Sequence, residues 1–322
     1  MAPDITVIIA TYNRAQELAR TLGGMARTEN GGLAVEFIVV DNGSTDQTKS
    51  VVGSISDRIP VKYIFEPHAG KNRALNTALD KIKLGRIIVF TDDDVDVSPD
   101  WLVSIRSVCD RWPNHAVFGG RINVVFPVEK VPQWTCDPYL YALGFAHHNI
   151  SDIECIYGTF VTPFGPNYWV RRDVFDNGRR FYEAVGPRPT NRIMGSETSF
   201  LISLQNDGYE IVYSPTVIVS HRVQPEMIRL STLFRRAYRA GRGMVHIYGL
   251  PRLPLLKKSP AAWRLHRAGS IIFYTFKVFV SLVFSPTEHR PRNVVDNMRN
   301  LGYRIEAMRL ADQALAKLRE PC

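Results

Sequence analysis

The chain has 322 residues, of which 45% are hydrophobic and 22% charged, so it can bury a large core and is neither disordered nor fibrous. Its four cysteines lie far apart without a CxxC pair, which argues against a zinc cage or a disulfide scaffold and favours reduced thiols in a cytosolic protein. The net charge of +9 is concentrated, because residues 222–267 contain eleven Arg or Lys and one acid. The basic balance therefore indicates a local partner surface. Without an RNA-binding motif it does not indicate a nucleic-acid-binding protein.

The first hundred residues alternate between short β-branched runs and helical patterns. Strands are expected at residues 5–10, 36–40, 61–65 and 86–90, with helices between them at 15–27, 46–55 and 73–83. This alternation predicts an α/β fold with a doubly wound, mostly parallel sheet, in which ligands bind beyond the carboxyl ends of the strands. Each of these strands ends in a polar cluster, at residues 11–14, 41–46, 66–68 and 91–94. We therefore expect the functional site at this edge of the sheet.

The remainder of the chain is less regular. Residues 98–100, Ser-Pro-Asp, are expected to cap a helix that has proline at its first position and runs to about residue 112. Further strands are expected at 116–126, 167–171 and 210–219, and further helices at 198–206, 227–240 and 301–318. Residues 127–163 are rich in aromatics and proline and are expected to form a long loop region. Residues 271–284 are apolar apart from Lys277 and are short for a transmembrane helix. They predict either a buried helix or a segment in the membrane interface.

Three adjacent carboxylates, Asp92, Asp93 and Asp94, follow the fourth predicted strand. Because like charges this close repel one another, the run needs a compensating charge. Mn²⁺ or Mg²⁺, held by one or two carboxylates and by substrate phosphates, supplies it. The alternative interpretation is a solvated acidic turn before the next helix.

Asp41 follows the second predicted strand. Its carboxylate can accept a hydrogen bond from a nucleobase N–H or from a ribose hydroxyl. The alternative is helix capping, for which Ser44, Thr45 and Asp46 are better candidates. We therefore expect Asp41 to be a ligand-binding residue and Asp46 to be mainly structural.

Four motifs stand in order along this part of the chain: Ala-Thr-Tyr-Asn-Arg at 10–14, Val-Val-Asp-Asn-Gly-Ser-Thr-Asp at 39–46, Gly-Lys-Asn-Arg-Ala-Leu-Asn at 70–76 and Asp-Asp-Asp at 92–94. Together they resemble the signature of family 2 glycosyltransferases with the GT-A fold, over about residues 4–222. The resemblance implies roles for eight residues. Ala10, Thr11 and Tyr12 would line the base pocket, Asp41 would hold the base, Arg73 would approach the nucleotide or its phosphates, Asp92 and Asp93 would contact ribose and donor sugar, and Asp94 would bind the metal. An exposed helix-face arginine is the alternative for Arg73.

Glu197 lies where this family usually carries an acidic pair whose last member is the catalytic base. Ser196 replaces the preceding acid, and a helical pattern follows. We expect Glu197 to be the base that takes the proton of the acceptor hydroxyl. The alternative is a glutamate that favours the helix dipole; the rival bases are Asp173, Asp176 and Glu183.

His221 follows the last predicted core strand. Several members of the family place a histidine there, within reach of the metal or the diphosphate. Imidazole is an acceptable Mn²⁺ ligand beside carboxylates. The two interpretations of His221 are therefore a metal ligand and a satisfied structural histidine.

The C-terminal part is basic and partly apolar. Arg235, Arg236, Arg239 and Arg242 are spaced so that several share one helical face, which would contact donor phosphates, a lipid diphosphate acceptor or anionic lipid, or else belong to a solvated helix packed on the core. We expect a GT-A domain at 1–222, with a donor half at 1–96 and an acceptor half at 97–222, followed by a helical region at 223–322. Residues 223–285 would make peripheral membrane contact. Because the N-terminus lacks a signal-peptide pattern, the expected location is the cytoplasm, peripherally on the inner membrane face.

These features predict an inverting, metal-dependent glycosyltransferase of the hexosyltransferase type. It would transfer a sugar from a nucleotide-diphosphate sugar, with a UDP-sugar favoured, to a glycan or lipid-linked acceptor. Trp134, Tyr139 and Tyr141 would shape the acceptor pocket or fill a subsidiary core. The alternatives are a sugar-1-phosphate nucleotidyltransferase, which would want a glycine-rich loop that residues 10–14 lack, and a non-catalytic membrane-associated scaffold on a GT-A core.

Overall fold

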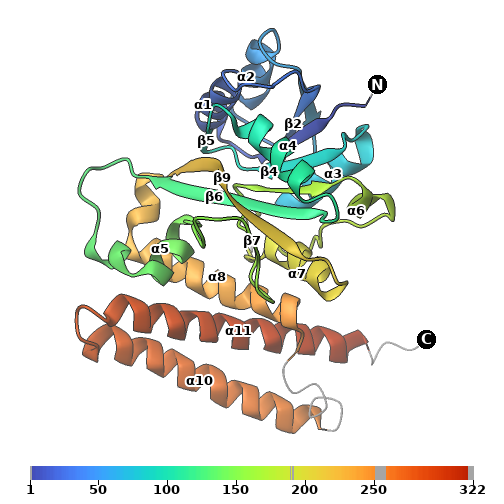
Figure 1. The fold of residues 1–322 in the computed structure, drawn as a ribbon. Coiled ribbons are helices and arrows are strands. Elements are labelled where there is room, and N and C mark those ends of the chain that lie inside the picture. The colour runs from blue at the N-terminus through green and yellow to red at the C-terminus, as the bar shows by residue number, and fades with distance from the viewer. Residues whose placement is uncertain (1, 189, 191, 251–258, 318–322) are drawn as a thin grey trace. The chain divides into compact units, whose positions relative to one another are not determined.

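The structure is a computed structural model that describes residues 2–188, 190, 192–250 and 259–317. The chain divides into two compact units (Figure 1). A sheet unit contains Met1–Glu129, Phe145–Thr190 and Ser196–Gln224, and a helical unit contains Lys130–Gly144, Asn191–Gly195 and Pro225–Cys322. Two segments of the expected domain 1–222, at 130–144 and 191–195, thus group with the C-terminal helices.

The first half of the sheet is parallel, as the sequence predicts. Its strands are β1 (Ile5–Thr11), β2 (Val35–Asp41), β3 (Val61–Phe65) and β4 (Ile87–Thr91), in the order β3-β2-β1-β4. The helices between them are α1 (Ala15–Met25), α2 (Thr48–Ile55) and α3 (Lys71–Lys81). Because Thr11 pairs with Asp41 at the last register position of β1 and β2, the polar ends of these strands meet at one edge.

The second half of the sheet mixes both directions. It contains β8 (Tyr168–Arg171), β6 (Val117–Val125), β9 (Ile211–Arg222) and β5 (Val95–Val97) in that order, with β7 (Cys155–Ile156) paired to β9. The helices here are α4 (Trp101–Arg111), α6 (Asp173–Asp176) and α7 (Ser196–Asn206). Two expectations were wrong in detail. Strand β9 runs beyond Val219 and includes His221, and Pro99 precedes α4 instead of opening it.

Two hydrophobic clusters cover the two faces of the sheet. Ile5, Val7 and Ile9 of β1 point into the cluster formed with α1, α2 and α4, whereas Ile8 points into the cluster formed with α3 and α7. This period of two is the alternation expected of a strand buried on both faces. The continuous apolar run of β1 therefore contributes to two cores at once.

The helical unit is built from long helices. It contains η1 (Gln133–Cys136), α5 (Pro138–Phe145), η2 (Pro225–Ile228), α8 (Leu230–Tyr248), α10 (Pro260–Phe284) and α11 (Arg290–Lys317). Helices α8 and α11 approach closely because glycines face backbone: a Cβ on Gly241 would collide with the carbonyl oxygen of Arg299, and one on Gly302 with that of Tyr238.

Several expectations for these regions change. The expected loop at 127–163 contains η1, α5 and β7, and the expected helix at 227–240 is α8, which begins and ends later. The last expected helix forms most of α11, and its residue 318 lies outside the described residues. The apolar run 271–284 belongs to α10, and its large side chains are mostly exposed, so the interpretation as a buried helix was wrong. Within the described ranges, α10 is long and apolar enough to cross a membrane by length and composition.

Candidate functional site

The carboxyl ends of β1 and β4 bring Thr11 and the three aspartates together. Thr11 Oγ1 donates to Oδ2 of Asp93 at 2.6 Å, and Thr21 Oγ1 of α1 donates to the Asp93 carbonyl oxygen at 2.8 Å. Asp93 and Asp94 are buried. Because β1 and β4 are parallel neighbours, this juxtaposition follows directly from the sheet order.

Arg14 compensates the two buried carboxylates. Its Nε lies 3.0 Å from Asp93 Oδ1, and its Nη2 lies 2.7 Å from Asp94 Oδ2. The preceding residue, Asn13, has a φ of 51°, a left-handed conformation that asparagine tolerates. The Asn13 side chain also accepts a hydrogen bond from the backbone N–H of Thr45 at 2.7 Å. The loop after β1 is thereby tied to the loop after β2, which positions Arg14 over the aspartates.

The pKa values of Asp93 and Asp94 shift in opposite directions. Burial raises the pKa of Asp93, against the opposing charge of Arg14. Burial would raise the pKa of Asp94 as well, but the hydrogen bond and charge of His221, together with Arg14, lower it below its usual range. The pKa of Asp94 is thus lowered and that of Asp93 raised, although both carboxylates are buried.

His221 faces Asp94 from the end of β9. Its Nδ1 lies 2.7 Å from the carbonyl oxygen of Phe145, and its Nε2 lies 3.5 Å from Asp94 Oδ2. Because a carbonyl oxygen only accepts, Nδ1 carries a proton and the ring presents Nε2 to the carboxylate. Burial lowers the pKa of His221, but hydrogen bonding to Asp94 and its charge outweigh this and raise it.

Asp94 and His221 fit a divalent cation. The Oδ1 atom of Asp94 is buried and has no hydrogen-bond partner in the described part of the chain. The backbone contact at Nδ1 of His221 is the arrangement that commonly orients a metal-binding imidazole. No group of three or more His, Cys, Asp or Glu residues suited to a metal occurs among the described residues. A cation held by these two side chains would take its remaining ligands from phosphate oxygens and water, as Mg²⁺ usually does.

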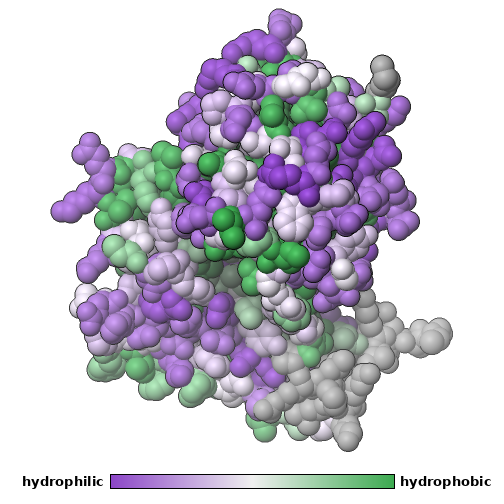
Figure 2. All heavy atoms as spheres, in the orientation of Figure 1, coloured by the Kyte–Doolittle hydropathy of each residue, from purple (hydrophilic) through white to green (hydrophobic). Residues whose placement is uncertain are grey.

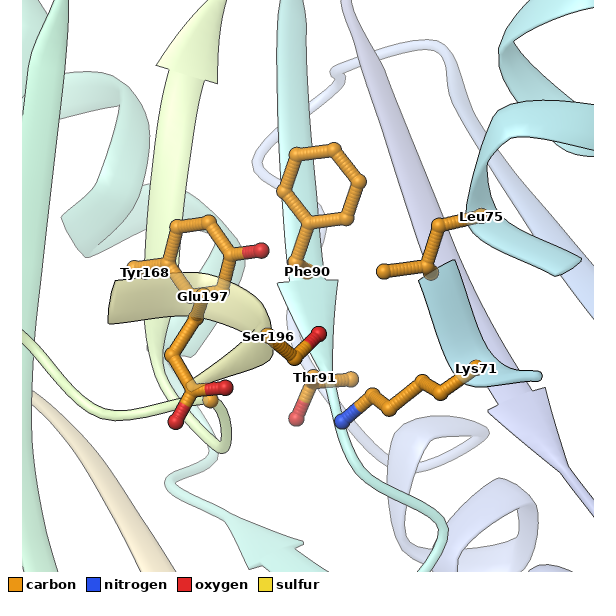
Figure 3. A pocket seen from close by; sticks show the side chains of 8 residues that line it. Lys71, Leu75, Phe90, Thr91, Tyr168, Ser196 and Glu197 are labelled. Atoms are coloured by element: carbon orange, nitrogen blue, oxygen red, sulfur yellow. The ribbon is translucent and has the colours of Figure 1, made fainter. Parts of the chain in front are cut away.

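Lys71 and Glu197 line one pocket, and Asp92 lies next to it as the partner of Lys71. Lys71 donates a hydrogen bond to Asp92 Oδ1, and the charges of Asp92 and Glu197 raise the pKa of this lysine although burial opposes the change. A Cβ on Gly165 would lie 3.6 Å from Asp92 Oδ2, from the Glu197 carboxyl carbon and from Lys71 Nζ. Figure 3 shows Lys71 and Glu197 pointing into this pocket from α3 and α7. The three side chains therefore converge next to Gly165, within van der Waals reach of where its side chain would start.

Glu197 is held at the start of α7 by its neighbour. Ser196 is buried, and its hydroxyl bonds to the Asn72 side-chain oxygen. Among the described residues nothing forms a hydrogen bond or salt bridge with the Glu197 carboxylate, which interacts with Lys71 through its charge. Of the rival bases, Glu183 lies 3.9 Å from Arg73 and bonds to Asn76. Asp173 and Asp176 lie on α6, and none of the three lines this pocket.

The expected base-binding residues lie at the same edge. Asp41 is buried; its Oδ1 accepts from the Ser44 N–H at 2.8 Å, and its Oδ2 accepts from the Tyr63 hydroxyl at 2.7 Å. Ala10 is partly buried, whereas 40% of Tyr12 is exposed at the end of β1. Both carboxylate oxygens of Asp41 are thus satisfied within the protein, and a nucleobase would share them.

Asp46 has the structural role expected of it. Its Oδ2 accepts from the backbone N–H of Ala15 at 2.9 Å, and its Oδ1 accepts from Thr48. It therefore connects the first turns of α1 and α2, in keeping with its position in the capping run of the sequence.

Arg73 pairs with two glutamates and not with the aspartates at the strand ends. Its guanidinium lies 3.6 Å from Glu66 and 3.9 Å from Glu183, and it is partly exposed. The cation of this motif that pairs with an aspartate is Lys71, two residues earlier, which bonds to Asp92 and to which the sequence pattern assigns no role. The sequence does carry a signal for Lys71: a lysine in the first turn of a helix is unfavourable next to the positive end of the helix dipole, so a nearby anion is expected to pair with it. Arg14 was likewise not predicted as the partner of Asp93 and Asp94.

The three aromatic side chains proposed for an acceptor pocket belong to the helical unit. Trp134 is buried and packs near Gly144. The ring of Tyr139 lies 4.0 Å from the guanidinium of Arg292, and its hydroxyl accepts from Arg299 at 2.7 Å. Tyr141, on α5, is partly buried. Trp134 thus has the environment of a subsidiary core, and the acceptor role remains a prediction.

Comparison with known proteins identifies the family. Residues 6–177 match the family described as glycosyl transferase family 2. Glycosyltransferase AglE of Haloferax volcanii is 26% identical over 256 residues, which cover 79% of this chain and 77% of AglE. The succinoglycan biosynthesis protein ExoM of Rhizobium meliloti is 28% identical over 242 residues, 74% of this chain and 72% of ExoM.

A solved structure supports the fold. The mannosyltransferase PcManGT from Pyrobaculum calidifontis, in complex with GDP-Man and Mn²⁺, matches with a TM-score of 0.54 and 19% identity, covering 100% of this chain and 77% of that one. The mixed sheet, the helices on both of its faces and the C-terminal helices agree with the expected GT-A fold. The chain therefore belongs to glycosyl transferase family 2 and is a glycosyltransferase.

Proposed function

We propose that the protein is an inverting, metal-dependent glycosyltransferase that uses a nucleotide-diphosphate sugar, specifically a UDP-sugar, and transfers the hexose to an acceptor hydroxyl. The observation that carries this proposal is the convergence of Asp92, Lys71 and Glu197 beside Gly165, next to the strand end that also carries Asp94. Asp92, a carboxylate expected on the donor side, and Glu197, the expected base, thus lie close to each other. A single displacement needs this arrangement, because the base must reach the acceptor on the face opposite the leaving group.

Asp94 and His221 would hold the divalent cation, Mn²⁺ or Mg²⁺. The unpartnered Asp94 Oδ1 and the Nε2 face of His221 support this assignment. When bound, the cation supplies neutralisation of the diphosphate leaving group. Asp92 and Asp93 would orient ribose and donor sugar, while Ala10, Thr11, Tyr12 and Asp41 would line the base pocket. Arg14 pairs with Asp93 and Asp94 and holds both carboxylates in place before the donor arrives.

Glu197 would take the proton of the acceptor hydroxyl as that oxygen attacks the anomeric carbon. Lys71 is bonded to Asp92 and interacts with the charge of Glu197, so it would place a positive charge between the donor side and the base. Arg73 remains a candidate for the nucleotide or its phosphates, although its present partners are Glu66 and Glu183.

We place the acceptor among glycans and lipid-linked sugars and the enzyme at the inner face of a membrane. ExoM is named for succinoglycan biosynthesis, which supports a glycan acceptor. The basic, partly apolar helical unit supports peripheral membrane contact within residues 223–285, of which 251–258 lie outside the described residues.

Calorimetric titration tests the donor. Purified protein is titrated with UDP and with GDP, each with and without Mn²⁺. UDP binding that requires Mn²⁺ is the expected result. Metal-dependent binding of GDP alone would keep the transferase and replace the proposed donor. Binding of neither nucleotide under any condition would contradict the proposed donor site.

A further inference from the structure

Helix α10 presents an apolar stripe to solvent. Leu265, Ile272, Phe276, Phe279 and Val283 follow one another at spacings of seven, four, three and four residues, so at 3.6 residues per turn they share one face. All five are exposed, from 50% of Val283 to 77% of Leu265. In Figure 2 hydrophobic spheres appear along the lower margin, where Figure 1 places α10. A contiguous apolar surface of this kind marks a docking site.

The opposite face of α10 is the one that packs against α11. Trp263, Arg267 and Ser281 are buried there, and Asn297 of α11 donates to the Ser281 hydroxyl at 2.8 Å. The helix therefore buries a mixed, partly polar face and exposes its most apolar one. Core formation does not explain this pattern, because a helix of a soluble unit normally turns its apolar stripe inward.

The charge of the unit decides what covers the stripe. Helix α10 contains no acid, and its Arg264 and Lys277 are exposed, whereas Arg267 is buried on the opposite face. An anionic bilayer surface attracts such a unit, each Lys or Arg near the surface contributing about 1 kcal/mol. A second copy of the chain would bring the same positive charges face to face. Charge complementarity thus favours lipid over self-association.

The packing also decides the orientation. If α10 crossed a bilayer, the charged helix α11 would have to enter the hydrocarbon or its contacts with α10 would be lost, including the ion pair of Arg264 with Asp312 at 2.8 Å. A helix that lies in the interface keeps those contacts, buries only the stripe and leaves Lys277 able to reach the headgroups.

We propose that α10 docks in the plane of an anionic membrane surface, with the stripe from Leu265 to Val283 inserted among the headgroups and α11 covering its other side. This inference deepens the peripheral contact in the proposed function by naming its surface, and it does not depend on the sugar donor.

Flotation of the full-length protein with vesicles tests the proposal. The vesicles contain phosphatidylcholine alone or with phosphatidylglycerol. The double variant Ile272→Ser/Phe276→Ser is compared with Ile153→Ser, a matched control in the sheet unit with 74% of its side chain exposed. We expect binding to the anionic vesicles, a loss of about tenfold or more in the double variant and no change in the control. Unchanged binding of the double variant, or no binding of the unmodified protein to either vesicle, would overturn the proposal.

The depth of α10 in the bilayer and the self-association of the protein are measured on the same samples. The indole added by Phe279→Trp should be quenched more by lipids brominated near the headgroup than by lipids brominated near the chain end. Stronger quenching at the chain end would mean a spanning helix, and a dimer that dissociates in the double variant would mean that a second copy covers the stripe. Either result overturns the proposal. The heats of UDP and Mn²⁺ binding, measured by calorimetry, should be equal in all variants. If the protein binds vesicles as expected but UDP produces no heat of binding, only the proposed function is refuted.

Discussion

Replacing Glu306 with glutamine should loosen the helical unit. Glu306 lies on α11, is completely buried and accepts from two residues of α8: Arg242 at 2.6 Å and His246 at 3.0 Å. Arg309, one turn along α11, also pairs with it. In the Glu306→Gln variant Arg242 and Arg309 face a neutral amide, and breaking a buried ion pair from one side is the costly way to remove it.

The magnitude follows from the pKa of Glu306. Burial would raise this pKa, but hydrogen bonds from His246, Arg309 and Arg242 lower it from 4.5 to about 2. At 1.36 kcal/mol for each tenfold change, this corresponds to roughly 3 kcal/mol of stability in the ionised form. Because the folded-state pKa lies below the unfolded one, this contribution is complete above about pH 4.5 and is lost as the pH falls towards 2.

Hydrogen exchange measured by mass spectrometry reports this loss of stability separately for each helix. Amides of α8 and α11 should exchange about 100-fold faster in Glu306→Gln at neutral pH, with less difference below pH 4.5 and none in the sheet unit. Asp312→Asn is the control, because its pair with Arg264 is about half exposed and should contribute below about 1 kcal/mol. An acceleration of less than about fivefold in Glu306→Gln, or one equal to the control, would refute the electrostatic reasoning.

Three further substitutions test the site and the sheet. Glu197→Gln should lower kcat by roughly 10²–10⁴ without weakening nucleotide binding, measured in a steady-state transfer assay against Glu183→Gln as control; a change below tenfold would exclude the base role. Gly165→Val should press on Asp92, Lys71 and Glu197 and abolish transfer, at a cost of about 1–3 kcal/mol in stability because Gly165 is buried, so full activity would mean that the pocket is not used. Gly120→Ala should cost about 1–3 kcal/mol in urea unfolding, because its Cβ would collide with the Asn167 side chain, and an unchanged midpoint would contradict the packing.

The sequence predicts the parallel half of the sheet well. The apolar runs of β1, β2 and β4 are largely buried on both faces, whereas β3 is a partly exposed edge strand, and the polar residues that follow the strands lie at the carboxyl edge. For this reason the strand pattern alone is enough to place Thr11, Asp41, Asp93 and Asp94 at one edge. The roles assigned to these residues stay predictions.

Other features depend on long-range packing that no local pattern carries. Lys71 meets Asp92, and Ser196 meets Asn72, only because α3 and α7 lie over the same sheet face. Arg73 looked equally suitable from the sequence, but its pairs with Glu66 and Glu183 arise from the loop arrangement. The exposed stripe of α10 has the composition of a buried helix, so composition could not distinguish the two.

Electron paramagnetic resonance of Mn²⁺ tests the central claim, that Asp94 holds the metal for a nucleotide-sugar donor. The signal of free Mn²⁺ is followed while protein is added in the presence and absence of UDP, for the unmodified chain, Asp94→Asn and the exposed control Asp100→Asn. We predict that UDP-dependent Mn²⁺ binding is retained in Asp100→Asn and falls at least tenfold in Asp94→Asn. Equal binding in all three proteins would contradict the assignment of Asp94 and with it the proposed donor site.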